Sequence, residues 1–349
     1  MKTIPTTEAV GAILCHDLTR IVKDQVKEAK FRKGHVVRAE DIPVLLSMGK
    51  KNLFVWDLGE DMVHENEAAE ILKEICLGPG LTPTPVKEGR ISLMAEIPGL
   101  FVADEAKVRQ INGLGEISVA SRHSGFEVVP GQMSAAFKII PLATRRDKLE
   151  KAQAIGAGRP LFEVKPYYPL TVGIVATGHE IYTGLIKDTF TPVVKQKVEK
   201  FGLTVVFETI VDDQLAEISG AINRLRAKNV DLIICTGGMS VDPDDLTPGA
   251  IKAAGAELVC YGTPVFPGAM FLVAYLDNKP VLGLPGCVMF ERRTIFDVLL
   301  PRIAAKVRIT PQEIQDLGLG GLCLNCLECV FPNCGFGKGP TYWPGSLDN

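Results

Sequence analysis

Residues 230–248 place an apolar strand, a glycine loop and a helix start in immediate succession. The apolar run ends in Thr-Gly-Gly at 236–238, acidic or hydroxyl side chains follow at 240, 242, 244 and 245, and Thr-Pro at 247–248 opens a helix. An α/β protein uses this succession to hold an anionic ligand, because backbone N–H groups and a helix start point toward it. Carboxylates beside such a loop indicate a divalent cation that shields phosphate charge. The segment therefore predicts a phosphate-plus-metal site in an α/β domain.

The segment 170–306 alternates strand and helix signals, which is typical of a parallel-sheet domain. We expect strands at 172–176, 203–211 and 232–235, and a hairpin over 271–282. Helices are expected from Thr191 and over 247–255, with Thr191 and Thr247 as caps before a proline at the first helical position, and at 215–228 and 288–305. Parallel sheets collect their ligand sites at the carboxyl ends of the strands. The loops 177–180, 236–245 and 283–286 should therefore meet at one edge. The predicted fold class is α/β, a parallel-type sheet flanked by helices.

The length of 349 residues predicts more than one domain, since single cores stop growing at about 250–300 residues. Helices are expected at 39–48, 65–76, 104–112 and 149–157, and strands at 53–56, 91–94, 117–120 and 135–140. The predicted organisation is a small α+β unit (1–80), a mostly β module (81–165), the α/β domain (166–308) and a Cys-rich tail (309–349).

The net charge of −3 gives no electrostatic footprint for nucleic acid, so no nucleic-acid partner is expected. No apolar run reaches membrane-spanning length, and residues 1–8 lack the apolar core of a signal peptide. We therefore expect no membrane partner and a cytoplasmic location.

The glycine loops have a simpler interpretation, in which the glycines only make turns and the acids only cap helices. That interpretation suffices for one loop. Three loops that converge on one sheet edge favour a ligand site instead.

With these motifs in order, residues 170–306 resemble the molybdopterin-binding domain shared by molybdopterin molybdotransferases and adenylyltransferases. The matching motifs are Ala-Thr-Gly-His-Glu at 176–180, Asp188, Val-Asp-Asp at 211–213, Thr-Gly-Gly-Met-Ser-Val at 236–241 with Asp245, and Gly-Leu-Pro-Gly at 283–286. The resemblance implies that Asp245 is catalytic and assists magnesium, with Asp242 and Asp244 as alternatives. It also implies a pterin-phosphate site, whose residues here are Thr177, Gly178, Glu180, Asp188, Thr236, Gly237, Gly238, Ser240, Thr247, Gly283, Pro285 and Gly286.

A molybdotransferase inserts molybdate into adenylylated molybdopterin and releases AMP. The resemblance therefore implies molybdopterin or adenylylated molybdopterin and molybdate as ligands, a homo-oligomer, and a molybdoenzyme as a further partner. Residues 31–55 also resemble a molybdotransferase segment, although here a β module separates that segment from the pterin domain.

Several positions depart from the molybdotransferase pattern. His179 stands where aspartate is usual, the Pro-Gly at 267–268 lacks its lysine, and Cys-Val at 287–288 replaces Asn-Pro. The phosphate-holding motifs are thus better matched than the oxyanion contacts. Two functions stay open, a molybdotransferase-like enzyme and a non-catalytic molybdopterin carrier or sensor with a redox or metal tail.

The tail carries four cysteines in C-x2-C-x2-C-x4-C spacing, at Cys323, Cys326, Cys329 and Cys334. Thiolates this close repel one another unless a cation neutralises them. The spacing resembles bacterial ferredoxins, while structural zinc sites more often use two separated pairs. An iron–sulfur cluster or zinc is predicted, with reversible disulfides or idle thiols as the alternative.

Overall fold

The computed structural model describes residues 2–22, 26–55 and 61–339. The chain divides into two compact units. Unit 1 comprises Met1–Ile97, Phe101–Ser124 and Val128–Val164, and unit 2 comprises Pro98–Leu100, Gly125–Glu127 and Lys165–Asn349. Each unit is described by itself below.

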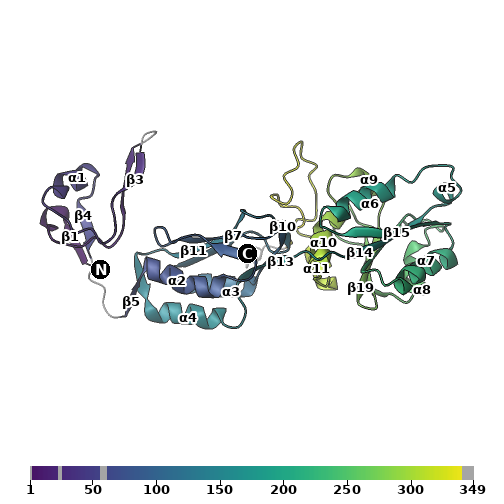
Figure 1. Cartoon of the computed structure of the whole chain (residues 1–349), viewed down its shortest axis with the longest axis horizontal. Coiled ribbons are helices and arrows are strands. Elements are labelled where there is room, and N and C mark those ends of the chain that lie inside the picture. Colours follow the sequence, from purple (N-terminus) through teal and green to yellow (C-terminus); the bar gives the residue numbers. More distant parts are fainter. Residues whose placement is uncertain (1, 23–25, 56–60, 340–349) are drawn as a thin grey trace, which may run out of the picture. The chain divides into compact units, whose positions relative to one another are not determined.

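Unit 2 is built on a six-stranded sheet of order β15-β14-β16-β19-β18-β17 (Figure 1). The strands are β14 (Thr171–Thr177), β15 (Thr204–Val211), β16 (Leu232–Thr236), β17 (Glu257–Tyr261), β18 (Leu272–Leu276) and β19 (Lys279–Leu284). Strands β15, β14, β16 and β19 are parallel, whereas β18 runs antiparallel to both β19 and β17. The predicted parallel-type sheet is confirmed.

The predicted hairpin is also confirmed, as the pair β18–β19. Asp277 and Asn278 form its turn with φ of 51° and 63°. A two-residue hairpin of this kind needs positive φ at both positions, which Asp and Asn tolerate better than most residues.

Helices cover both faces of the sheet (Figure 1). They are α5 (His179–Tyr182), α6 (Phe190–Glu199), α7 (Leu215–Ala227), α8 (Thr247–Ala253), α9 (Cys287–Phe290), α10 (Ile295–Ala304) and α11 (Pro311–Asp316). Successive strand residues point to opposite faces. Ile174 and Ile234 accordingly share a core with α6 and α10, while Val175 and Cys235 share the other core with α7 and α8. The apolar runs of these strands are therefore buried on both sides.

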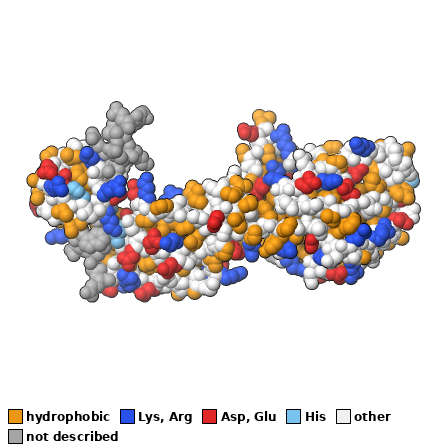
Figure 2. Space-filling view, viewed as in Figure 1, with side chains coloured by type: hydrophobic (Ala, Val, Ile, Leu, Met, Phe, Trp, Pro, Cys, Tyr) orange, Lys and Arg blue, Asp and Glu red, His pale blue; other side chains and the backbone are white. Residues whose placement is uncertain are grey.

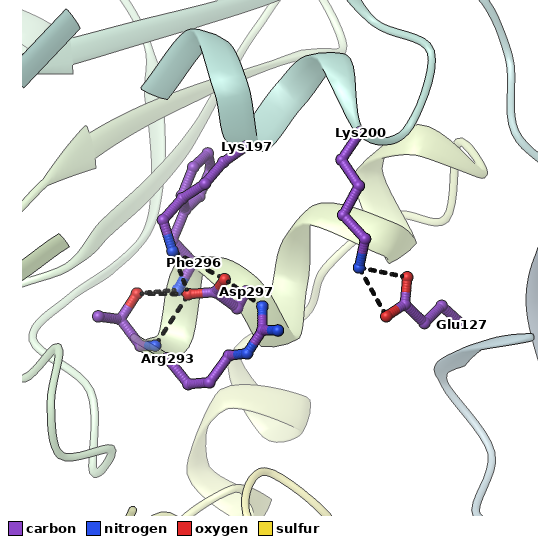
Figure 3. Close-up of polar contacts among 7 residues, drawn as sticks. Glu127, Lys197, Lys200, Arg293, Phe296 and Asp297 are labelled. Carbon is purple, nitrogen blue, oxygen red and sulfur yellow. Dashed lines mark hydrogen bonds and ion pairs between the residues drawn. The ribbon is translucent and has the colours of Figure 1, made fainter. Parts of the chain in front are cut away.

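A buried carboxylate joins α6 to α10. The Asp297 side chain is 7% exposed, and both of its carboxylate oxygens lie 2.8 Å from Lys197 Nζ (Figure 3). Its Oδ1 also lies 3.1 Å from Arg293 Nη1. Its Oδ2 also accepts hydrogen bonds from the backbone N–H and hydroxyl of Thr294. Nearby, Lys200 pairs with Glu127 at 2.8 Å (Figure 3).

Three predictions about helix starts in unit 2 are wrong. The single helix expected at 288–305 is two helices, because Thr294 and Asp297 form a capping box that begins α10 anew. Helix α6 begins at Phe190 rather than Thr191, and the Asp188 carboxylate accepts from the first backbone N–H groups. Thr247 is the first residue of α8 rather than its cap.

Unit 1 has two apolar cores in its described residues. The first lies in the N-terminal part, with β1 (Lys2–Pro5) paired to β4 (Asn52–Val55) and helix α1 (Asp41–Ser47) near its predicted range. The hairpin of β2 (Leu18–Val22) and β3 (Val26–Phe31) and the 3-10 turn η1 (Thr6–Glu8) complete this part. Trp56, the predicted end of β4, lies outside the described residues.

The second core of unit 1 belongs to an antiparallel sheet of order β6-β7-β11-β9. The strands are β6 (Leu81–Pro83), β7 (Ile91–Ala95), β9 (Ile117–Ser121) and β11 (Met133–Ile139). Helices α2 (Glu65–Cys76), α3 (Glu105–Gly113) and α4 (Arg146–Gly156) contribute buried side chains to the same core. Shorter strands are β5 (Met62–His64), β8 (Gly99–Ala103), β10 (Phe126–Val128), β12 (Ala143–Arg145) and β13 (Phe162–Pro166).

Positive and negative side chains are interspersed over the face drawn in Figure 2. Among the helices of the described residues, none combines the length and the apolar character that crossing a bilayer requires.

Candidate functional site

The parallel strands of unit 2 end at one edge, level with one another. In the strand register Ala176 lies opposite Thr236, Thr236 opposite Leu284, and Thr177 opposite Val211. The loops after β14, β16 and β19, together with Asp212 and Asp213 after β15, therefore share this edge. The predicted convergence of three loops is confirmed by the register.

Three of the candidate threonines are buried at the edge, and two of them support the glycine loop. Thr177, Thr236 and Thr247 are each at most 4% exposed. The Thr247 hydroxyl donates its one proton to the Gly237 carbonyl at 2.8 Å. The Thr177 hydroxyl lies 3.4 Å from Thr247 Oγ1 and is therefore the donor in the contact between the two threonines. Thr177 and Thr247 thus position the loop, and their hydroxyls are used within the protein.

Gly237 and Gly238 lie in the left-handed region, with φ of 87° and 55°. A Cβ on Gly237 would lie 2.1 Å from the Thr177 carbonyl oxygen, and one on Gly238 would lie 2.9 Å from Thr247 Oγ1. The loop after β16 thus needs glycine because it passes directly over the end of β14. Glycine here fixes where the loop's N–H groups lie.

The acidic part of the loop is a tight turn. The Asp242 N–H donates to Asp245 Oδ2 at 3.0 Å, and the Asp245 N–H donates to the Asp242 carbonyl at 3.0 Å. Asp242, Asp244 and Ser240 are exposed, and Asp245 is half-buried. Asp245 therefore shapes the turn as well as presenting charge at the edge.

Tyr261, on β17, is a residue that the sequence motifs did not single out. Its hydroxyl lies 2.9 Å from the Ser240 carbonyl and 3.1 Å from the Met239 carbonyl. Burial raises the pKa of Tyr261, and the Asp245 carboxylate raises it further. A lone tyrosine in a strand carries no sequence signal for this contact with the loop.

The first loop is held by the acids that follow β15. The His179 Nδ1–H donates to Asp212 Oδ1 at 2.9 Å, and the His179 backbone N–H donates to Asp213 Oδ2 at 2.8 Å. The hydrogen bond to Asp212 raises the pKa of His179 and lowers the pKa of Asp212. Gly178, with φ of 147°, allows the chain to leave β14 at this point, and Glu180 is exposed.

Asp188 lies two residues before α6, and its carboxylate serves the start of that helix. Its Oδ1 accepts from the N–H groups of Phe190 and Thr191, and its Oδ2 accepts from the Thr191 hydroxyl. Both oxygens therefore serve the helix start. A cavity of about 440 Å³ beside α6 and β15 also borders Asp188.

The third loop contacts the second through Gly283. A Cβ on Gly283 would lie 2.5 Å from the sulfur of Met239, so only glycine lets Met239 pack there. Pro285 is buried, whereas Gly286 is exposed and a Cβ added to it would meet nothing within 4 Å. The open space beside Gly286 is compatible with a bound ligand at the edge.

The donor set at the edge suits magnesium that arrives with phosphate. In the described ranges, no group of three or more His, Cys, Asp or Glu side chains gathers as a metal site. Mg²⁺ prefers one or two carboxylates together with phosphate oxygens and water. The turn at Asp242–Asp245 offers such carboxylates, and the remaining ligands would come from the substrate.

The tail packs on unit 2 without bringing its thiols together in the described residues. Phe336 belongs to the core shared with α6 and α10, and Cys323 and Cys334 pack against it. Cys326 and Cys329 are exposed. The Phe331 N–H and the Arg293 guanidinium lower the pKa of Cys329, and Arg292 Nη1 donates to the Leu327 carbonyl at 3.1 Å.

Two family models match the chain. The model described as "Probable molybdopterin binding domain" matches residues 173–305, and a domain of unknown function matches residues 3–57. The first model covers the whole parallel edge described above. Residues 31–55, which resemble a molybdotransferase segment, fall within the second.

The chain is similar to curated molybdopterin molybdenumtransferases. It is 33% identical to that of Staphylococcus aureus (strain COL) over 132 residues, covering 36% of this chain and 31% of the relative. It is 31% identical to the molybdopterin molybdenumtransferase of Haemophilus influenzae over 149 residues, which covers 41% of this chain and 36% of the relative. The chain thus spans about a third of the length of these relatives.

Among solved structures, the molybdopterin biosynthesis moea protein from Pyrococcus horikosii is similar at 15% identity and a TM-score of 0.32. The match covers 70% of this chain and 81% of that chain. The family model covers the loops at the edge of the sheet. Residues 173–305 of this chain therefore match the family model described as a probable molybdopterin binding domain.

Proposed function

We propose that the chain acts in molybdenum-cofactor synthesis, as a molybdotransferase-like protein that binds adenylylated molybdopterin, inserts molybdate and releases AMP. The observation that carries the proposal is the edge itself. Loops after three parallel strands meet there in register, within the segment that matches the molybdopterin-binding family. Relatives of the chain are named molybdopterin molybdenumtransferases.

In this proposal the glycine loop holds the pterin phosphate with its backbone N–H groups. Thr177 and Thr247 keep the loop in place from below, and Tyr261 holds its far side. Asp245 presents charge beside the phosphate. Mg²⁺, when bound, would neutralise phosphate charge, and Asp245 would hold it.

Molybdate, a molybdoenzyme partner and a homo-oligomer belong to the same proposal, as does a cytoplasmic location. A second candidate is a non-catalytic carrier or sensor of molybdopterin. Two observations favour that candidate. Both oxygens of Asp188 are engaged in the helix start, and His179 is paired with Asp212 where aspartate is usual.

Replacing Asp245 by asparagine is expected to lower AMP release on the order of 100-fold, the effect of removing one electrostatic group from a reaction site. Asparagine can still accept the hydrogen bond from Asp242 N–H, so the turn should survive. The assay is anaerobic AMP release from adenylylated molybdopterin with magnesium and molybdate.

Asp242→Ala is the matched control, because only the Asp242 backbone takes part in the hydrogen bonds of the turn. It should retain AMP release within about tenfold of wild type. No AMP from wild type, with molybdopterin still bound, would leave the carrier as the better account. Full activity in Asp245→Asn would contradict the assigned role of Asp245.

For the tail we propose one metal centre, zinc or an iron–sulfur cluster, on Cys323, Cys326, Cys329 and Cys334. The close spacing of the four thiols supports it. Exposure of Cys326 and Cys329 would let both move toward Cys323 and Cys334. In their described arrangement the thiols do not form a site, so binding would rearrange the tail.

Anaerobically purified protein is expected to hold one such centre per chain, by elemental analysis and the visible spectrum. Cys326→Ser should lose it, because three thiolates bind less firmly than four. Cys235→Ser is the control, since that thiol is buried in the sheet. Protein without iron or zinc, or equal metal in both variants, would refute the metal tail.

A further inference from the structure

Unit 1 contains a cavity of about 1080 Å³ that the proposed function does not use. Its walls come from the open end of the hairpin β2–β3 (residues 16, 17, 19, 32 and 33), from the start of α2 and from the segment 84–92. Arg32, Lys33, Lys87 and Arg90 line it, so these separate segments bring cationic groups together. A cavity of this size accommodates a small-molecule ligand.

Lys33 is held in the wall by a neutral histidine. The backbone N–H of Asn66 lies 3.2 Å from His64 Nδ1 and can only donate. His64 Nδ1 therefore accepts this hydrogen bond and carries no proton. The Cys15 carbonyl can only accept, so His64 Nε2, at 2.5 Å, carries the proton. Lys33 Nζ, 2.9 Å from Nδ1, therefore donates to it. The imidazole orients the Lys33 ammonium and contributes no negative charge.

The lining also contains a buried acid, at the start of α2. Glu65, 6% exposed, lines the cavity, and a Cβ on Gly89 would lie 2.6 Å from its Oε2. Burial raises the pKa of Glu65 and lowers the pKa of Lys33 and of His64. Titratable groups perturbed together around a cavity are typical of functional sites.

The charge of the lining favours an anion. Four Lys or Arg side chains face Asp17, Glu65 and Glu88. One oxygen of Asp17 already accepts the Lys33 N–H at 2.7 Å, and burial favours the neutral form of Glu65. Arg32, Lys87 and Arg90 are exposed at their side chains, so a ligand can reach them. Arginine forks and a lysine ammonium are the groups that recognise phosphate and carboxylate.

We propose that this cavity is a second ligand site, which binds a small, multiply charged oxyanion through Lys33, Arg32, Lys87 and Arg90. His64 is a positioning residue that aims the Lys33 ammonium. The site lies in unit 1, independent of the pterin edge, and its ligand is a phosphate- or carboxylate-bearing small molecule.

The experiment titrates the full chain with inorganic pyrophosphate and, separately, with citrate. The chain has five histidines, so imidazole NMR signals report on each site. His16 lines the cavity and His64 contacts Lys33, whereas His179 lies at the pterin edge. Binding in the cavity is expected to shift the His16 and His64 signals. Binding of pyrophosphate but not of citrate would identify phosphate as the ligand group. Binding of both probes would show that the site also accepts carboxylates.

Lys33→Gln keeps a donor for His64 and removes the charge, so we expect binding about tenfold weaker or more. Lys33→Arg should bind within about threefold of wild type, and Arg90→Gln should weaken binding on its own. Lys151→Gln makes the same charge change on α4, 64% exposed and outside the cavity, and should leave affinity unchanged.

A titration in which neither probe shifts the His16 or the His64 signal would overturn the proposal. So would equal affinity in Lys33→Gln and Lys151→Gln. A shift of His179 alone would locate the anion at the pterin edge and exclude the cavity. Because the reporters differ, failure here leaves the proposed function untouched.

Discussion

Gly237→Ala is expected to destabilise unit 2 by about 2–5 kcal/mol and to weaken molybdopterin binding more than about tenfold. The new Cβ would lie 2.1 Å from the Thr177 carbonyl oxygen, so the backbone of one loop must move away from the other. The φ of 87° adds strain for any residue with a Cβ. Hydrogen exchange of peptides from β14 and β16 measures the stability, and anaerobic equilibrium dialysis measures the binding.

Gly255→Ala is the matched control for this variant. Gly255 has φ of 91°, but a Cβ there would meet nothing within 4 Å. It should cost only the backbone strain of about 1–2 kcal/mol and leave molybdopterin binding unchanged. If the two variants bind molybdopterin equally, the packing of the glycine loop on Thr177 does not govern the site.

Asp297→Ala is expected to lower the free energy of unfolding of unit 2 by about 3–5 kcal/mol, because it leaves buried cations without their partner. Lys197 and Arg293 are 16% and 28% exposed, and both pair with this carboxylate (Figure 3). The variant also removes the capping box that begins α10. Denaturant-dependent hydrogen exchange of peptides from α6 and α10 gives the value.

Glu208→Ala provides the comparison, because it removes the partner of another lysine of α6. Glu208 pairs with Lys195 of α6 at 2.7 Å, but the two side chains are 44% and 37% exposed. Exposed pairs contribute about 0–1 kcal/mol, so this variant should change little. Asp297→Asn, which can still accept from Thr294, should fall between the two. A loss in Asp297→Ala no larger than in Glu208→Ala would contradict the structural role of Asp297.

The parallel sheet and its edge could be predicted from the sequence because the signals are local. Apolar runs such as 232–235 are short, lack polar residues and end in glycine, and the strand register then brings their loops together without further information. The turn at Asp277 and Asn278 is local in the same way.

Helix starts were less predictable because several residues compete to cap a helix. Asp188 rather than Thr191 accepts from the first N–H groups of α6. Thr294 and Asp297 begin a new helix within the segment 288–305, which was predicted as a single helix. The start of α11 follows the same rule, with Thr310 and Glu313 forming a capping box in the segment predicted as a Cys-rich tail. Capping depends on which side chain can reach the N–H groups, and spacing alone does not decide that.

Contacts between segments that are distant in the chain could not be predicted from the sequence. Tyr261 reaches the glycine loop from another strand, and Lys33 meets His64 across 31 positions. The tertiary fold creates both contacts, and neither residue carries a motif.

The central claim, that the edge formed by the loops after β14, β16 and β19 binds molybdopterin, is tested most directly by one titration. Molybdopterin is added anaerobically to the full chain while the histidine signals are followed by NMR. His179 lies in the first loop, paired with Asp212, so its signal should shift and saturate at one molybdopterin per chain, while His16 and His64 stay unchanged. No binding, or binding that leaves the His179 signal unchanged, would contradict the account.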